Sequence, residues 1–257
     1  LASFDGKGYA VQDGVAKRLG MTSMPMPSRA MGDHQAEYVC LLGLMAATCS
    51  KIGREVYTLM KQEFGEVEEP VPPGTVGSST MPQKRNPKLS QDIIAAAMQV
   101  RALVPQALES MQTEHEADRT TSITMNHALQ EASAQMGDIL SRMTMMLEGM
   151  TLNPERMRQN LDLTDGMIMA ETLMLSLGET IGRQEAHDVI YDAAQAAATG
   201  AGNFTELLEA DAKVQAHMTS AQVRELLDPT AYIGECAAMA RTQADRARKV
   251  AADINAS

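Results

Sequence analysis

Residues 77–87 read GSSTMPQKRNP, a stretch whose groups together could bind an anion. Its serines and threonine offer hydroxyl and N–H donors, while Lys84, Arg85 and Lys88 place positive charge beside a helix start predicted at Pro87. Lysines, loop N–H groups and a helix N-terminus favour a carboxylate or a phosphate. The residues therefore predict a loop that folds over an anion; the alternative is a solvated surface loop that precedes a helix.

Composition excludes several other classes of function. The 257 residues carry a formal net charge of −11, and nucleic-acid binding needs clustered Lys and Arg to neutralise phosphates. No apolar run reaches the roughly 18 residues of a membrane span. Cys40, Cys49 and Cys236 lack CxxC spacing, and the first two lie in an apolar helical pattern, which favours buried thiols. We expect a cytoplasmic protein without nucleic-acid or membrane partners.

The elements around the loop are predicted to be helices. Hydrophobic residues make up 44%, aromatic residues only 3%, and there are 21 Met and no Trp, which is typical of a helical core built from Ala, Leu and Met. Residues 21–28 are a predicted connection. The prolines and glycines of 64–85 exclude a regular element there and predict a long loop. The helices expected in this half span 5–19, 29–63, and Pro87 to about Met111 with a kink at Pro105; a third long helix ends near Met150.

Two of these helices show apolar residues at alternating spacings of four and three, the pattern of a packed bundle. A methionine stripe could bind a metal, but this spacing favours core packing, and no metal site is predicted. The first pattern is Tyr38, Leu42, Met45, Cys49, Ile52, Val56 and Leu59. The second is Met125, Leu129, Ala132, Met136, Ile139, Met143, Met146 and Met150.

A break follows at Thr151, where Asn153 and Pro154 are a predicted N-cap and first helical residue. The fold class we expect is all-α: a long-helix bundle domain over 1–151, with a signature loop at 64–87, followed by a smaller helical domain over 152–257. The helices expected in the second domain span 165–179, 183–198, 204–216, 219–227 and 231–255.

The loop sequence closely resembles the signature of the fumarase/aspartase superfamily, G-S-S-x-M-P-x-K-x-N-P. Every fixed position of that signature is met, by Gly77, Ser78, Ser79, Met81, Pro82, Lys84, Asn86 and Pro87. The resemblance implies a homotetramer with a shared helical bundle, and active sites that each draw on three subunits. It also implies reversible β-elimination from a substrate with a carboxylate, or the related lactonising addition, without a cofactor.

By this resemblance Ser78 is the base that removes the proton beside the carboxylate, and Lys84 and Asn86 bind that carboxylate. Ser79, Thr80 and Met81 are further expected contacts to a small di- or tricarboxylate. Proton removal moves negative charge onto the carboxylate, so donors must already point at it. A serine hydroxyl is a weak base and needs nearby positive charge and exclusion of water.

Within the superfamily, residues 160–194 and 226–239 resemble 3-carboxy-cis,cis-muconate cycloisomerase more than adenylosuccinate lyase. Asn126 stands near the place of an arginine that helps those lyases hold the nucleotide, and Gln91 replaces a glutamate of theirs. Gly32 and His34 replace arginines common to both. The leading interpretation is a cycloisomerase-like enzyme; adenylosuccinate lyase or another C–N lyase is the alternative, and a non-catalytic scaffold like the lens crystallins is a third.

The resemblance also implies a proton-donating histidine on a segment upstream of Leu1. None of the five histidines here has a matching context, and structural or surface roles are expected for His115, His127, His187 and His217. The sequence begins LASFDGKG without Met. We therefore expect an N-terminally incomplete member, and this piece alone could be inactive.

Overall fold

The computed structural model describes residues 4–26, 29–71, 74, 80–81 and 84–256. These residues form eleven α-helices, short 3-10 turns and two strands of two residues each. The expectation of an all-α fold is confirmed. The chain divides into two compact units, Leu1–Asn153 and Pro154–Ser257.

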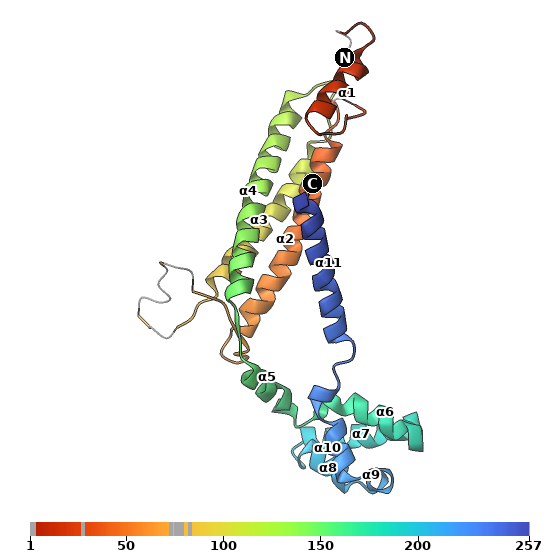
Figure 1. Ribbon diagram of the computed structural model, residues 1–257. Helices are drawn as coiled ribbons and strands as arrows, with labels where there is room; N and C mark the ends of the chain where they lie inside the picture. The colour runs from red at the N-terminus through yellow and green to blue at the C-terminus, as the bar shows by residue number, and fades with distance from the viewer. Residues whose placement is uncertain (1–3, 27–28, 72–73, 75–79, 82–83, 257) are drawn as a thin grey trace. The chain divides into compact units, whose positions relative to one another are not determined.

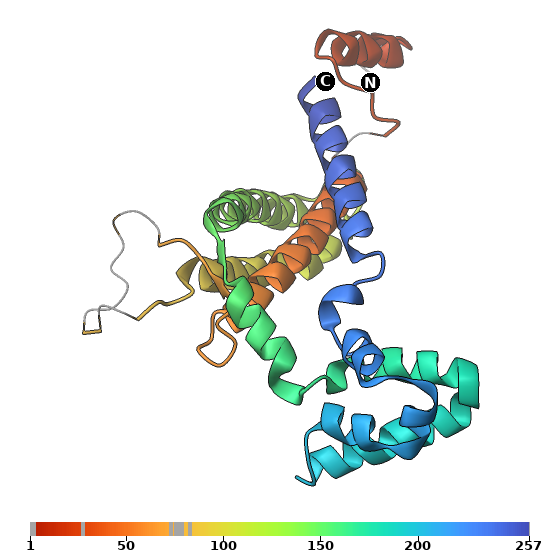
Figure 2. The same cartoon turned by 60° about the horizontal axis from the view of Figure 1, so that its bottom comes forward.

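Three long helices pack on one another in the first unit (Figure 1). They are α2 (Asp33–Leu59), α3 (Lys88–Glu109) and α4 (Arg119–Gly149), and the short α1 (Gly8–Arg18) precedes them. Figure 2 shows the same three helices side by side from another direction. α2 is shorter at both ends than predicted. α3 begins directly after Pro87, as expected, but ends two residues before the predicted Met111, and Pro105 lies inside it. The bundle core includes Val39, Leu42, Ala46, Leu89, Ile93, Val100, Met136, Ile139 and Met146.

The pattern predicted for α2 is half wrong. Leu42, Cys49 and Val56 are buried, but Tyr38 and Met45 are each 44% exposed, and Val39 and Ala46 are buried instead. The reason is that small residues of α2 face α3: a Cβ on Gly43 would lie 2.7 Å from Val104 Cγ2. Such positions allow close helix packing but carry no apolar signal.

The pattern predicted for α4 is largely confirmed. Met125, Ala132, Met136, Ile139, Met143 and Met146 are all buried, and Ala128 takes the place of Leu129. Because these methionines are buried along one face of α4, they serve the packing of the core. Among the described residues no group of three or more His, Cys, Asp or Glu side chains could hold a metal ion.

A strand corrects the expectation that 64–85 has no regular element. β1 (Val67–Glu68) pairs antiparallel with β2 (Thr151–Leu152), and Asn153 N–H donates to Glu66 O at 2.9 Å. The first proline of this stretch is residue 70, so Val67 and Glu68 keep the N–H groups that a ladder needs. The start of the signature loop is thereby fixed to the end of α4.

The second unit is a smaller helical domain around its own core. α5 (Pro154–Leu161) and the 3-10 turns Asp162–Thr164 and Met167–Met169 lead into α6 (Ala170–Ile181) and α7 (Arg183–Ala198). α8 (Phe204–Ala210), α9 (Ala212–His217), α10 (Ser220–Leu226), the 3-10 turn Pro229–Ala231 and α11 (Cys236–Ala256) follow. The core contains Met169, Leu173, Leu177, Ile190, Phe204, Leu208, Val214 and Val223.

The single helix predicted over 204–216 is wrong, because it is two helices. Asp211 has an extended backbone (φ −68°, ψ 129°), and its carboxylate accepts N–H bonds from Lys213 and Val214 as the N-cap of α9. An aspartate in this position favours a new helix start over continuation. Likewise, the helix predicted from 165 begins only at Ala170, after left-handed residues Asp165 and Gly166.

No helix in the described parts of the chain combines the length and the apolarity that crossing a bilayer requires.

Candidate functional site

Two adjacent glutamates tie the start of the signature loop to its end. Glu68, in β1, forms an ion pair with Arg85, with 2.9 Å between Oε1 and Nε. This pair lies at the surface, since the two side chains are 47% and 56% exposed. Glu69 is only 5% exposed and turns the other way, into the bundle.

The buried carboxylate of Glu69 caps the N-terminus of α3. Oε1 accepts the N–H of Leu89 at 2.8 Å, and Oε2 accepts the N–H of Ser90 at 3.0 Å and the Ser90 hydroxyl at 2.7 Å. The first N–H groups of a helix have no partner within it and carry partial positive charge, so they stabilise a carboxylate there. The segment between Glu69 and Leu89 is therefore a loop closed at its base.

A cleft of about 570 Å³ lies where this closed base meets the end of α2. The signature loop contributes Met81, Lys84 and Arg85 to its lining, and the end of α2 and the turn after it contribute Tyr57, Met60 and Lys61. The lining thus combines three cationic side chains with two methionines. Such a cleft fits a small molecule that has an apolar carbon skeleton and negative charges.

Of the three cationic side chains that line this cleft, one is paired with a carboxylate among the described residues. Arg85 is paired with Glu68, whereas the ammonium groups of Lys84 and Lys61 have no carboxylate within ion-pair distance in the described portion of the chain. Lys61 Nζ instead lies 5.9 Å from the centre of the Tyr57 ring. Two cations are thus available to an anionic ligand.

Comparison with known proteins agrees with this chemistry. The family described as "Lyase" matches residues 2–102, and the family described as "Adenylosuccinate lyase C-terminus" matches residues 166–242. A 3-carboxy-cis,cis-muconate cycloisomerase of Pseudomonas aeruginosa is 35% identical over 242 residues, which is 93% of this chain and 52% of that protein. The chain belongs to the fumarase/aspartase superfamily.

Other members of the superfamily show the same extent of similarity. The N-acetyl-S-(2-succino)cysteine lyase of Enterococcus italicus is 34% identical over 92% of this chain and 52% of that protein. The crystal structure of 3-carboxy-cis,cis-muconate lactonizing enzyme from Pseudomonas putida superposes with a TM-score of 0.81 at 33% identity, over 91% of this chain and 52% of that one. This chain therefore spans about half the length of the superfamily members it matches.

The predicted site residues are only partly described. Ser78 and Ser79 lie outside the described residues, so their roles stay predictions. Met81 and Lys84 line the cleft, and the N–H of Lys84 donates to Met81 O at 3.0 Å, which places both in one turn. Thr80 is exposed and Asn86 half-buried, and neither is part of the cleft lining.

Sequence reasoning missed four residues that shape this site. Glu68 and Glu69 fall in the stretch predicted to be a loop, and Tyr57 and Lys61 fall near the end of the helix predicted over 29–63. One signal was available for Lys61 and Tyr57: in the helix predicted to run to residue 63 they are four residues apart and would share a face. No sequence signal distinguishes the buried Glu69 from its exposed neighbour.

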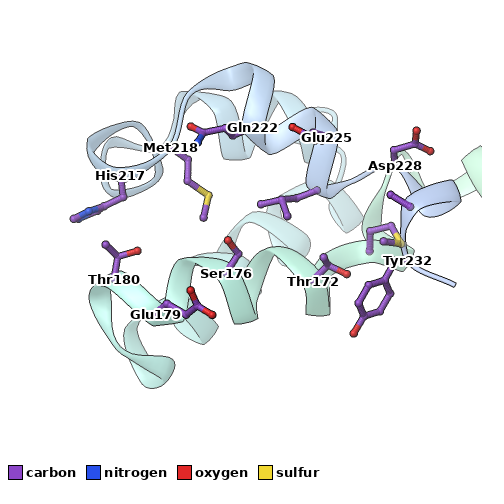
Figure 3. Close-up of a pocket in the computed structure, with 13 residues that line it drawn as sticks. Thr172, Ser176, Glu179, Thr180, His217, Met218, Gln222, Glu225, Asp228 and Tyr232 are labelled. Atoms are coloured by element: carbon purple, nitrogen blue, oxygen red, sulfur yellow. The ribbon is translucent and has the colours of Figure 1, made fainter. Parts of the chain in front are cut away.

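A second cavity, of about 540 Å³, lies within the C-terminal unit. Figure 3 shows Thr172, Ser176 and Glu179 of α6 on one side and Gln222 and Glu225 of α10 on the other. Several of its polar groups already serve the fold. Gln222 completes the capping box of α10, and Asp228 accepts the Thr230 N–H and pairs with Arg158.

The two cavities also differ in the charge of the side chains that line them. The second one is lined by the carboxylates of Glu179, Glu225 and Asp228, and it has no lysine or arginine among its described lining residues. Hydrogen bonds from the Thr230 N–H and then from Arg158 hold the pKa of Asp228 below its usual range, so it stays ionised. A carboxylate ligand would be repelled there, so this cavity suits such a ligand less well than the basic cleft does.

Proposed function

We propose that this chain forms part of an enzyme that catalyses reversible elimination and addition beside a carboxylate, in the manner of 3-carboxy-cis,cis-muconate cycloisomerase. The observation that carries the proposal is that Lys84 of the signature lines a basic cleft, on a loop whose base is closed by Glu68 and Glu69. This geometry supports binding of a carboxylate, and similarity to cycloisomerases and lyases supports the reaction class.

The proposed mechanism uses Ser78 as the base. Its oxygen takes the proton from the carbon next to the substrate carboxylate, and the electron pair of that C–H bond moves into the carboxylate. Lys84 and Asn86 stabilise the added charge, which is the interaction that must be stronger in the transition state than in the ground state. The leaving group on the neighbouring carbon then departs with its bonding pair, and a double bond forms. Lactonisation runs the same steps in reverse, with a carboxylate oxygen as the group that adds.

A second candidate is elimination from a succino thioether or amine, with release of fumarate. The relative from Enterococcus italicus, named for a substrate in which sulfur carries a succino group, is similar to nearly the same degree as the cycloisomerase. The two candidates share the base and the carboxylate site and differ in the leaving group. Gln91 lies in the first turn of α3, at a position where adenylosuccinate lyases carry a glutamate. This difference disfavours the adenylosuccinate alternative.

We also propose that the protein is a cytoplasmic homotetramer with active sites shared between subunits. In the single chain, α2 exposes apolar residues on one face, among them Leu41 at 52% and Leu44 at 67%. Contiguous apolar surface of this kind is typical of an interface. A shared site would supply the groups that the proposed mechanism needs besides those of this cleft, including its proton donor.

The experiment that tests the function is a substrate panel with the complete gene product, monitored by the ultraviolet absorbance of the conjugated acid. The panel contains 3-carboxymuconate, N-acetyl-S-(2-succino)cysteine, adenylosuccinate and argininosuccinate. Ser78→Ala should abolish turnover of the active substrate, while Ser79→Ala should reduce it less. If every compound is inert, or if Ser78→Ala leaves turnover unchanged, the proposal is wrong, and a non-catalytic scaffold becomes the better interpretation.

A further inference from the structure

The end of α2 brings a second cation to the cleft, from outside the signature. Lys61 lines the same cleft as Lys84 and lies just after the end of α2, four residues beyond Tyr57. Its Nζ lies 5.9 Å from the centre of the half-buried Tyr57 ring. A cation this close to an aromatic face is attracted to it, which restrains the long lysine side chain.

The other charged groups of the cleft do not compete for the role of Lys61. Arg85 is engaged by Glu68 at 2.9 Å and so belongs to the closure of the loop. Lys84 comes from the signature loop, and Met60, Met81 and Pro87 line the same cleft. The cleft therefore combines two lysines, from two separate segments of the chain, with apolar side chains.

We infer that Lys61 binds a second carboxylate of the substrate, remote from the carboxylate at Lys84, and so makes the site selective for polycarboxylates. The inference rests on the proposed function only in taking Lys84 as the contact to the reacting carboxylate. The methionines contact the carbon skeleton that joins the two carboxylates. A compound with a single carboxylate can occupy the Lys84 side but leaves Lys61 without a partner.

Binding of inert acids tests this without any turnover. Tricarballylate, with three carboxylates on a three-carbon chain, and propionate, with one, are titrated by calorimetry or by ligand-observed NMR. Lys61→Met should weaken tricarballylate binding about tenfold, the loss of one charge-assisted contact at a partly exposed site, and leave propionate binding unchanged. Lys84→Met should weaken the binding of both acids. Lys61→Arg keeps the charge and should retain most of the affinity for tricarballylate.

The matched control is Lys51→Met, which removes the charge of an exposed lysine within α2 that does not line the cleft. Equal effects of Lys61→Met and Lys51→Met on tricarballylate would overturn the inference, as would equal weakening of both acids by Lys61→Met. The outcome is independent of the proposed reaction. If the substrate panel is inert but tricarballylate is preferred through Lys61, the proposed function is rejected and the second carboxylate site is retained. If the enzyme is active but shows no such preference, the function is retained and the second carboxylate site is rejected.

Discussion

The hydroxyl of Ser90 donates a 2.7 Å hydrogen bond to the carboxylate of Glu69, 21 positions earlier in the chain. Both residues are buried, and the signature loop runs between them. The position of the loop is therefore coupled to the stability of the bundle through one carboxylate.

Glu69→Gln should lower the free energy of unfolding by about 2 kcal/mol, because an amide nitrogen cannot accept the N–H and O–H groups that now point at the carboxylate. Urea unfolding followed by circular dichroism measures this. Glu68→Gln, which alters an exposed ion pair at the neighbouring position, should cost no more than about 1 kcal/mol. Similar losses for the two variants would show that the buried carboxylate has no special role.

Gly149→Ala should displace the start of the loop. A Cβ at this position, the last residue of α4, would lie 2.6 Å from Pro70 Cγ and 2.7 Å from Pro70 Cβ. Since Pro70 follows Glu69 directly, we expect a loss of stability and a fall in turnover of the active substrate. Gly137→Ala, where a Cβ would meet nothing within 4 Å, is the control and should be neutral or stabilising. Wild-type behaviour of Gly149→Ala would contradict the close packing of Gly149 against Pro70.

Lys84→Met should reduce kcat/KM for the active substrate by about two orders of magnitude, the usual cost of removing one preorganised group that stabilises developing charge. Steady-state kinetics at several ionic strengths measures this. A loss confined to KM would mean that Lys84 contributes only to ground-state binding. Lys51→Met is again the control and should leave kcat/KM unchanged.

Leu44→Glu should dissociate the proposed tetramer, because a charge would enter the exposed apolar face of α2. Size-exclusion chromatography with light scattering measures the mass. The same substitution at Leu163, which is 76% exposed in the C-terminal unit, should leave the mass unchanged. A monomeric wild-type protein would reject the proposed assembly at once.

Cys49 should make the protein less stable in alkaline solution. Burial raises the pKa of its thiol above the ordinary value, so the unfolded chain ionises first as pH rises. The stabilisation is therefore complete below the ordinary thiol pKa, about 8.5, and is lost as the pH rises through the higher folded value. The urea midpoint of the wild type should fall more steeply above about pH 8.5 than that of Cys49→Ala. Parallel pH profiles would contradict this.

The buried faces of the helices were predicted best from the sequence where the core is made of large apolar side chains. The α4 seam is an example, because Met136, Ile139 and Met143 mark the buried face themselves. α2 was predicted less well, because Gly43 and Ala46 allow α3 to approach while the larger Tyr38 and Met45 are exposed in the single chain.

The candidate site shows the same limit of sequence reasoning. The signature motif predicted Lys84, which lines the cleft, but it could not predict Lys61 or Glu69, which lie before it in the chain. Glu69 follows another glutamate and precedes a proline, so nothing local distinguishes it. Its burial depends on N–H groups that only the tertiary fold brings within reach.

The tie between Glu69 and the start of α3 also affects the entropy of substrate binding. An untethered segment of about 20 residues loses closure entropy that grows with the logarithm of its length when its ends are brought together. In this protein the ends are already joined in the folded chain, across 20 positions between Glu69 and Leu89. A ligand that binds at Lys84 therefore does not have to bring these ends together, and more of its interaction energy remains as affinity.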